Sequence, residues 1–426
     1  MTRSMRAVLL GTFTLRFSTG LTGGLLVFYL ARLHELGGPR VDEITLGVLT
    51  ATFFAAELVL STPFGMLSDR WGHHRVMQLG PIFGAVAVVV TWLSTDLLII
   101  GGTRWLEGAS TAASVPSILG FIALVTAGDE LLRGRMAARF EGATLAGLGG
   151  GIVAAGVLYD GIPGGWSGLG RDAFLLNAFL YGGSFLIYRY GVADPARGHP
   201  VQRVAHSWGR YARLLVSSHV WLLAPTWIAV NAAIGLWTSQ TIFQLIREPD
   251  GRFPDQLLMG GFVGAQIALG LGVALLIFFA GLAYWGERFR TMRRTTIILY
   301  GVGGGALSVI AAAAVNHAAS APAIVPPLLG MVAAGGLFVL AGATPAALGL
   351  LADISEAYPA DRGAIMGLYS VFLALGQITG SLIGGVAAMA FGMDGILGAT
   401  LALLAVAVLP ISRLRPFEHV VGTTAG

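Results

Sequence analysis

Apolar residues in this chain form long uninterrupted runs, and polar residues are gathered in the gaps between them. Twelve runs have the length of roughly 20 residues that an α-helix needs to cross the hydrocarbon core of a bilayer. They lie at 7–31, 45–64, 77–94, 97–126, 136–159, 173–190, 219–243, 257–284, 295–314, 323–351, 364–391 and 396–412. The pattern predicts an all-α membrane protein with 12 transmembrane helices.

One longer polar interruption, at 191–217, separates six of these runs from the other six. It contains Pro195, Pro200 and four Arg residues, followed by Trp208, Tyr211, Leu214 and Leu215 in an amphipathic run. Such a segment is typical of a stretch that lies along the membrane interface. We therefore expect an N-terminal six-helix bundle at 1–190, a cytoplasmic linker at 191–217, a C-terminal six-helix bundle at 218–412 and a cytoplasmic tail at 413–426.

The two predicted bundles carry related sequences. A single shift, without gaps, places Pro116 on Pro345 and Gly120 on Gly349. The same shift places Arg133-Gly134 on Arg362-Gly363, and Gly147, Gly151 and Gly156 on Gly376, Gly380 and Gly385. We interpret this as an internal repeat, which predicts two pseudo-symmetric bundles. Parallel repeats with a substrate site between them are an architecture of alternating-access carriers.

Composition agrees with a membrane protein and excludes several kinds of chemistry. The chain is 55% hydrophobic and 11% charged, against about 25% charged in soluble domains. It has no Cys, so it has no disulfide or thiolate metal site, and it has no Lys, so it has no Walker A loop. His73-His74 is the only adjacent His pair and lies beside cations, which predicts no metal site.

Arginine is distributed unequally between the gaps. With the N-terminus inside, the even-numbered gaps and both tails hold 19 Arg, and the other gaps hold 5. This bias is the positive-inside pattern, and it predicts a protein of the plasma or inner membrane with both termini in the cytoplasm. The basic pI of about 9.6 is therefore a topology signal and does not indicate nucleic-acid binding.

The segment from Gly65 to Arg75, GMLSDRWGHHR, follows the second apolar run. It resembles the loop between helices 2 and 3 of the major facilitator superfamily, in the G-x-L-x-D-R-x-G-R/K-R/K pattern. His73 and His74 depart from this pattern, because the family usually has cations there. The resemblance implies the fold of that family and a gating loop whose residues here are Gly65, Asp69, Arg70, Gly72 and Arg75. It also implies that Asp69 docks against the helix that begins near Arg362, where a carboxylate meets a positive helix end. An ordinary topogenic loop is the simpler alternative.

Glycines are concentrated in the fifth predicted helix, at Gly142, Gly147, Gly149, Gly150, Gly151 and Gly156. This helix is similar to the glycine-rich motif of drug–proton antiporters in the same superfamily, which indicates an exporter-like branch. The proline of that motif is absent here, and close helix packing alone would explain the glycines.

Two pairs of charged residues lie inside predicted helices, where charge is costly. Arg104 and Glu107 are one helical turn apart and either neutralise each other or form a functional pair. Arg16 and Glu57 lie at similar depths on neighbouring helices and form a second candidate pair. A carboxylate paired with Arg in such a place can exchange a proton when the pair breaks. We rank Glu57 first as a proton-coupling carboxylate, Glu107 second and Glu141 third.

The second half offers polar residues without charge, with Asn231, Trp237 and Gln240 on the seventh helix and Gln377 on the eleventh. They are candidates for lining a substrate cavity, and equally for hydrogen bonds between helices.

Together these features predict a secondary transporter that moves a small solute by alternating access, with protons as the coupling ion. The favoured hypothesis is export of a lipophilic or amphipathic compound by a monomer in the lipid bilayer, without a cofactor. An organic-anion carrier that uses Arg16 and Arg104 for a carboxylate or phosphate is the alternative. A membrane-embedded enzyme or sensor is a third hypothesis, and no compact catalytic constellation supports it.

Overall fold

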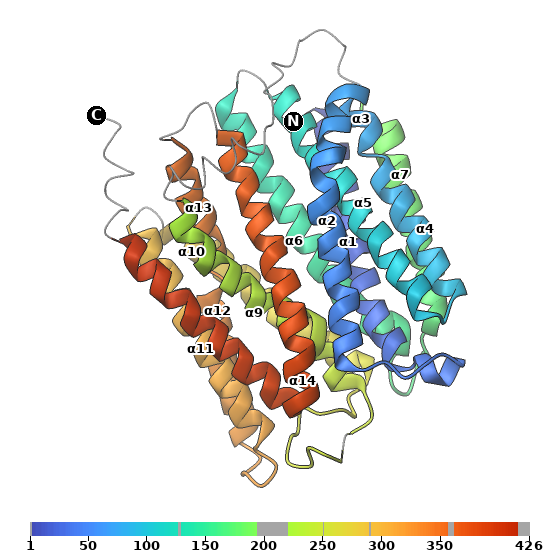
Figure 1. Cartoon of the computed structure of the whole chain (residues 1–426), viewed down its shortest axis with the longest axis vertical. Helices are drawn as coiled ribbons and strands as arrows, with labels where there is room; N and C mark the ends of the chain where they lie inside the picture. Colours follow the sequence, from blue (N-terminus) through green and yellow to red (C-terminus); the bar gives the residue numbers. More distant parts are fainter. Residues whose placement is uncertain are drawn as a thin grey trace. The chain divides into compact units, whose positions relative to one another are not determined.

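The structure is a computed structural model that describes residues 2–126, 129–193, 220–249, 251–288, 291–356 and 362–415. Every regular element within these ranges is a helix (Figure 1), so the all-α prediction is confirmed. The amphipathic segment of the predicted linker and the tail beyond residue 415 lie outside the described residues.

The first half contains seven α-helices and two short 3₁₀ helices. They are α1 (Arg3–Ala31), η1 (Leu33–Leu36), α2 (Glu43–Trp71), α3 (His73–Val76), α4 (Leu79–Leu93), α5 (Leu97–Val125), α6 (Glu130–Asp160), η2 (Gly170–Asp172) and α7 (Ala173–Gly191). Helix α1 packs against α6 and α7, and α5 packs against α2 and α4.

The described part of the second half contains six helices. They are α9 (Val220–Ile246), α10 (Gly264–Arg288), α11 (Arg294–Asn316), α12 (Val325–Leu340), α13 (Ala343–Glu356) and α14 (Arg362–Leu414). Helix α14 is bent at Gly392, which has a φ of 61°, and Figure 1 shows its two arms in red. The bend separates the eleventh and twelfth predicted spans.

Among the described residues, nine helical segments are long and apolar enough to cross a membrane, and one of them is the bent stretch Ser370–Arg413. The structure therefore has many helices that are candidates for crossing a membrane. The count of 12 crossings stays a prediction.

Two predicted spans have different ends in the structure. Helix α10 begins at Gly264, later than the expected start at Leu257, because Gly260 and Gly261 take positive φ angles of 82° and 81° in the preceding turns. The span predicted at 323–351 is divided into α12 and α13 by a short turn after Leu340.

The predicted gating loop is also different, because most of it is helical. Helix α2 continues through Gly65 and Asp69 to Trp71. The turn occurs at Gly72, which has a φ of 95° and is followed directly by α3. A positive φ strains any residue with a side chain, so Gly72 is required by the turn. Gly65 is an ordinary helical residue, and the prediction that it forms part of a loop was wrong.

The chain divides into two compact units. Unit 1 comprises residues 1–203 and 262–272, and unit 2 comprises residues 204–261 and 273–426. The cut after residue 203 falls outside the described residues, so the predicted boundaries of the linker stay a prediction. The other two cuts, after residues 261 and 272, fall just before the start of α10 and within it.

The internal repeat is visible as equivalent packing inside each unit. A Cβ atom placed on Gly147 would lie 2.8 Å from Cβ of Arg16, and one placed on Gly376 would lie 2.5 Å from Cβ of Asn231. The two glycines are related by the shift of the sequence repeat. Arg16 and Asn231 are related by a smaller shift, because the connections within the halves differ in length.

The same two sequence shifts, one for each helix of the interface, relate further contacts in the two units. Gly151 meets the backbone of Phe17, and its counterpart Gly380 meets the backbone of Ala232. The other helix of each interface also contributes a glycine. Gly20 of α1 packs on Leu148 of α6, and Gly235 of α9 packs on Gln377 of α14. Small residues at helix interfaces let two backbones approach closely. Each unit therefore contains the same interface, α1 with α6 in unit 1 and α9 with α14 in unit 2.

Candidate functional site

Buried charge is found in only one of the two units among the residues that the structure describes. In unit 1, Arg16, Arg104 and Glu107 lie buried within the helices, together with Glu43 and His74 near helix ends. The buried polar residues described in unit 2 are all neutral. Buried charges require partners because desolvation is costly, so unit 1 is the first place to look for a site.

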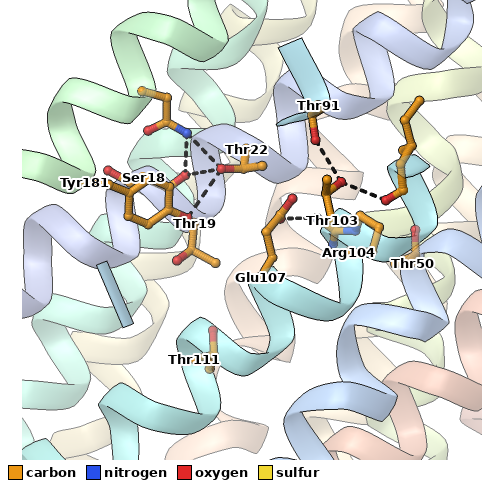
Figure 2. Close-up of polar contacts among 12 residues, drawn as sticks. Ser18, Thr19, Thr22, Thr50, Thr91, Thr103, Arg104, Glu107, Thr111 and Tyr181 are labelled. Atoms are coloured by element: carbon orange, nitrogen blue, oxygen red, sulfur yellow. Dashed lines mark hydrogen bonds and ion pairs between the residues drawn. The ribbon is translucent and has the colours of Figure 1, made fainter. Parts of the chain in front are cut away.

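Arg104 and Glu107 form an ion pair one turn apart on α5 (Figure 2). The guanidinium carbon also lies 4.8 Å from the ring centre of Phe53 on α2, a cation–π contact. The Arg104 Nε and the Glu107 Oε1 have no hydrogen-bond partner in the described structure. The pair is therefore electrically neutral as a unit, with one donor and one acceptor still available.

A hydroxyl network lies close to this pair and joins α1 to α7 (Figure 2). Asn177 donates from Nδ2 to the Ser18 carbonyl oxygen at 3.0 Å and to Thr22 Oγ1 at 2.8 Å. The Tyr181 hydroxyl lies 3.4 Å from Thr22 Oγ1. Glu107 lies near enough to Tyr181 to interact electrostatically with it. The polar interior of unit 1 therefore includes contributions from α1, α5 and α7.

Arg16 does not form the predicted ion pair with Glu57. Its Nη1 donates to Thr111 Oγ1 on α5 at 3.4 Å, and no carboxylate oxygen of the described residues lies within 4.0 Å of its nitrogens. The guanidinium nevertheless interacts electrostatically with both Glu57 and Glu141. One buried cation thus stands near two carboxylates at longer range.

These two carboxylates come from different helices, Glu57 from α2 and Glu141 from α6. The backbone of α2 at Glu57 is packed closely against Gly108 of α5, where an added Cβ would lie 3.0 Å from the Glu57 nitrogen. Sequence reasoning placed Glu57 with Arg16 alone. It could not place Glu141 there as well, because that proximity depends on how α6 packs against α1.

The polar candidates in unit 2 lie at the repeated interface. Asn231, the counterpart of Arg16, donates from Nδ2 to the carbonyl oxygen of Trp227 on its own helix at 2.8 Å. Trp237 donates from Nε1 to Thr400 Oγ1 at 2.8 Å. Gln240 and Gln377 are buried, and Gln377 Oε1 accepts no hydrogen bond within the described structure. Trp237 thus makes a hydrogen bond between helices, Asn231 makes one within its own helix, and Gln377 Oε1 is an acceptor without a partner.

The gating segment brings a carboxylate and an imidazole together at the end of α2. Asp69 Oδ1 lies 4.0 Å from His73 Nε2, and Ser68 Oγ lies 3.1 Å from His73 Nδ1. The cations Arg70 and Arg75 are exposed. The predicted partner of Asp69, at the start of the helix containing Arg362-Gly363, has side chains outside the described residues.

His73 has a counterpart in the second half. Its ring packs against Gly120 of α5, and Arg294 packs against Gly349, the repeat counterpart of Gly120. Arg294 also donates from Nη1 to the carbonyl oxygen of Gly349. One position in the repeat therefore carries a titratable imidazole in unit 1 and a permanent cation in unit 2.

A family model described as Major Facilitator Superfamily matches residues 8–339, well over half of the chain. The chain belongs to the Major Facilitator Superfamily. Proteins of this superfamily are membrane transporters, so membrane transport of a small molecule follows from membership. No curated protein matches the sequence.

Solved structures show the superfamily fold over almost the whole chain. The nucleoside transporter NupG matches with a TM-score of 0.69 and 12% identity, covering 99% of this chain and 100% of its own. A bacterial homologue of the human lysosomal transporter Spinster, inward-facing and occupied, matches with a TM-score of 0.68 and 14% identity, covering 99% and 96%. At such identities the likeness establishes the fold of this superfamily member and nothing finer.

Sequence reasoning missed two polar clusters of this superfamily member, both at helix ends. In the first, Asp160 at the end of α6 pairs with Arg32 and accepts a hydrogen bond of 2.8 Å from the backbone nitrogen of Gly264. In the second, His317 lies between Asp255 and Asp394. The available signal was an acidic residue at the end of an apolar run, which does not by itself reveal a partner.

Proposed function

We propose that this chain is a proton-coupled secondary transporter that moves a small, uncharged or amphipathic solute by alternating access. The observation that carries the proposal is the buried guanidinium of Arg16, which stands near Glu57 and Glu141 without pairing closely with either. Glu57 keeps its first rank as the coupling carboxylate. Glu141 replaces Glu107 in second place, because Glu107 is already held by Arg104.

The charges of this cluster favour proton exchange. Two ionised carboxylates and one guanidinium leave one negative charge in excess inside the membrane, where charge is strongly disfavoured. A proton on Glu57 or Glu141 restores neutrality. Since the two carboxylates are on α2 and α6, a change in the packing of either helix would alter which of them Arg16 neutralises. Proton binding and helix rearrangement would then be linked.

The geometry disfavours the organic-anion alternative. That hypothesis needs Arg16 and Arg104 free to bind a carboxylate or phosphate, but Arg104 is paired with Glu107. Arg16 lies in the field of two carboxylates, which would repel a second anion. Within unit 1, Glu107 Oε1 is a buried acceptor without a partner, and an acceptor of this kind is suited to a donor on a neutral solute.

Direction, location and branch remain predictions of the sequence. We retain export, the plasma or inner membrane and cytoplasmic termini as the working hypothesis, with a monomer as the working unit. The glycines that suggested an antiporter branch, Gly147 and Gly151, are accounted for by their contacts with α1. They therefore no longer favour the exporter-like branch. Nucleosides should be tested first among neutral solutes, because one structural neighbour is named a nucleoside transporter.

The decisive experiment is transport by proteoliposomes with an imposed pH gradient, using a library of neutral, cationic and anionic solutes. We expect saturable, gradient-driven flux of neutral or amphipathic compounds. Glu57→Gln should abolish gradient-driven flux but preserve exchange of solute across the membrane without a gradient. Glu35→Gln, an exposed carboxylate of η1, is the control and should leave both unchanged.

Three results would contradict the proposal. Absence of saturable flux across the library would remove the transport assignment for these solutes. Flux confined to anions would restore the alternative based on Arg16 and Arg104. Normal gradient-driven flux in Glu57→Gln and in Glu141→Gln would show that neither carboxylate couples proton movement to solute movement.

A further inference from the structure

His317 follows the last residue of α11, in unit 2, and each of its ring nitrogens faces a carboxylate. Its Nε2 lies 2.9 Å and 3.0 Å from the two carboxylate oxygens of Asp394. Its Nδ1 lies 3.3 Å from Oδ2 of Asp255. Asp394 belongs to α14, and Asp255 belongs to the connection between α9 and α10. One imidazole therefore bridges two elements that are far apart in the sequence.

Asp394 is the centre of a wider set of hydrogen bonds. It accepts from Asn316 Nδ2 at 2.9 Å and from Gln256 Nε2 at 3.1 Å. Gln256 Oε1 in turn accepts from the backbone nitrogen of Met393 at 2.9 Å. Asn316 Oδ1 accepts from the backbone nitrogen of Leu258 at 2.9 Å. Three segments are thus joined: the end of α11, the α9–α10 connection and α14.

The place where they join is the bend of α14. Gly392 has a φ of 61°, and a Cβ there would lie 2.8 Å from Gln256 Oε1 and 3.1 Å from the sulfur of Met259. The α9–α10 connection is therefore seated directly in the bend. If the bridge through His317 is weakened, the connection is still held by the hydrogen bonds of Gln256 and Asn316 and by the apolar packing of Met259.

The geometry suits a doubly protonated ring. A histidinium donates from both nitrogens and can bond to Asp255 and Asp394 together. A neutral imidazole has one donor, so its other nitrogen presents a lone pair to a carboxylate. Asp255 and Asp394 are the ion-pair partners of His317 in the described structure, and the guanidinium carbon of the nearby Arg252 lies 5.3 Å from the ring centre of Phe253. A doubly protonated His317 would therefore have a carboxylate acceptor at each ring nitrogen.

We propose that His317, Asp255 and Asp394 form a second proton-binding site, which clamps the α9–α10 connection into the bend of α14 when His317 is protonated. The side chains of His317 and Asp394 are 42% and 38% exposed, so protons reach the site from solvent. On the predicted topology this face is non-cytoplasmic. The clamp shares no residue with the cluster around Arg16. An experiment that disproves proton coupling through Glu57 or Glu141 would therefore leave the proposed clamp untouched.

Cysteine labelling provides the test, because the chain contains no Cys. Met259→Cys places a thiol at a buried position beneath the clamp, and Ser320→Cys places one at an exposed position nearby. Each variant is labelled in detergent with a polar maleimide at about pH 5.5 and about pH 8, which lie on either side of ordinary histidine titration. The ratio of the two labelling rates cancels the pH dependence that the two thiols share, and the same ratio measured in the His317→Gln background corrects for the part that comes from burial of the thiol.

We expect this ratio, buried over exposed, to rise about fivefold from the acidic to the basic condition, as befits a partly exposed ion pair. Adding His317→Gln should leave the ratio high and independent of pH. Asp255→Asn, at an exposed side chain whose loss will not prevent folding, should reduce the pH effect. His34→Gln is the matched control, since His34 has no carboxylate within 4.0 Å in the described structure, and should change nothing. A ratio that does not vary with pH, or one that still varies equally in His317→Gln and Asp255→Asn, would overturn the proposal.

Discussion

The two units share a scaffold and differ in the chemistry attached to it. At the α1–α6 interface Gly147 packs beside Arg16, and at the α9–α14 interface Gly376 packs beside Asn231. Arg104 and Glu107 of α5 correspond, by the shift that relates the two glycines, to Ala333 and Gly336 of α12. Each half has the same backbone contacts, while buried charge among the described residues is found in unit 1 alone. Packing and charge can therefore be altered separately, and each of the following substitutions does so.

The largest effect is expected at the repeated glycine contacts. A side chain on Gly151 or on Gly380 would overlap the backbone of Phe17 or of Ala232, and backbone cannot rotate aside. Gly151→Val and Gly380→Val should each prevent recovery of monodisperse protein on size-exclusion chromatography. Gly142→Ala on α6 is the control, because nothing lies within 4 Å of an added Cβ, and it should raise helix stability slightly. Normal folding of either valine variant would contradict the assigned register.

The next effect concerns the ion pair that unit 2 lacks. Arg104→Ala leaves Glu107 buried without its partner, and breaking a buried pair in this way costs about 3–5 kcal/mol. The double variant Arg104→Ala/Glu107→Ala leaves no uncompensated charge, so it should be more stable than Arg104→Ala alone. Thermal unfolding in detergent measures both. The single variant Glu107→Ala completes the comparison. If the double variant loses as much stability as Arg104→Ala and Glu107→Ala lose together, the pair cannot be replaced by small apolar residues.

A smaller loss of stability is expected when the N-terminal cap of a helix is removed, and two helices differ in where that cap comes from. Helix α2 begins with its own cap, since the Asp42 carboxylate accepts from the Thr45 backbone nitrogen at 2.7 Å. Helix α10 begins at Gly264, whose nitrogen donates to Asp160 of α6. Asp42→Ala should cost about 1 kcal/mol. Asp160→Ala should cost more, because it also removes the partner of Arg32. Equal losses in thermal unfolding would contradict this.

The cap at Asp42 also has a defined pH dependence. Hydrogen bonds from Thr45 hold the pKa of the Asp42 carboxyl below its usual range. A group whose pKa is lowered by folding stabilises the native state above the pKa of the unfolded chain, and this contribution disappears as pH falls through the lower, folded value. The difference in stability between wild type and Asp42→Ala should therefore shrink in acid and be constant near neutrality.

The smallest effect is expected where the halves differ between an imidazole, His73, and a guanidinium, Arg294. His73→Arg gives unit 1 the residue that unit 2 has at Arg294, which packs on the counterpart of Gly120. The variant should fold, with a smaller change in unfolding temperature than that of Asp42→Ala. A loss larger than this would mean that the pocket around Gly120 is specific for imidazole, which could be tested further with His73→Gln.

Much of the fold could be predicted because membrane helices are specified by length and apolarity alone. The internal repeat could also be predicted from the sequence, because one shift relates Gly147 to Gly376. Helix ends were harder, since the start of α10 depends on Gly260 and Gly261 adopting positive φ angles and α2 simply continues past Gly65.

The candidate site was predictable in composition but not in pairing. The spacing of Arg104 and Glu107 within one helix was enough to predict their ion pair, because local geometry determines it. Arg16 could not be assigned in this way. Its position relative to Glu57, Glu141 and Thr111 depends on the packing of three other helices. The bridge made by His317 likewise joins segments that no local pattern connects.

The glycine contacts have a consequence for how such a protein can diverge. Where a backbone lies directly against a glycine, as Leu148 does at Gly20 and Gln377 does at Gly235, the glycine cannot gain a side chain unless the backbone moves. The neighbouring positions are then free to change from Arg to Asn, or from Leu to Gln, while the interface persists. A scaffold held together by backbone contact can thus acquire new specificities by mutation without first losing its fold.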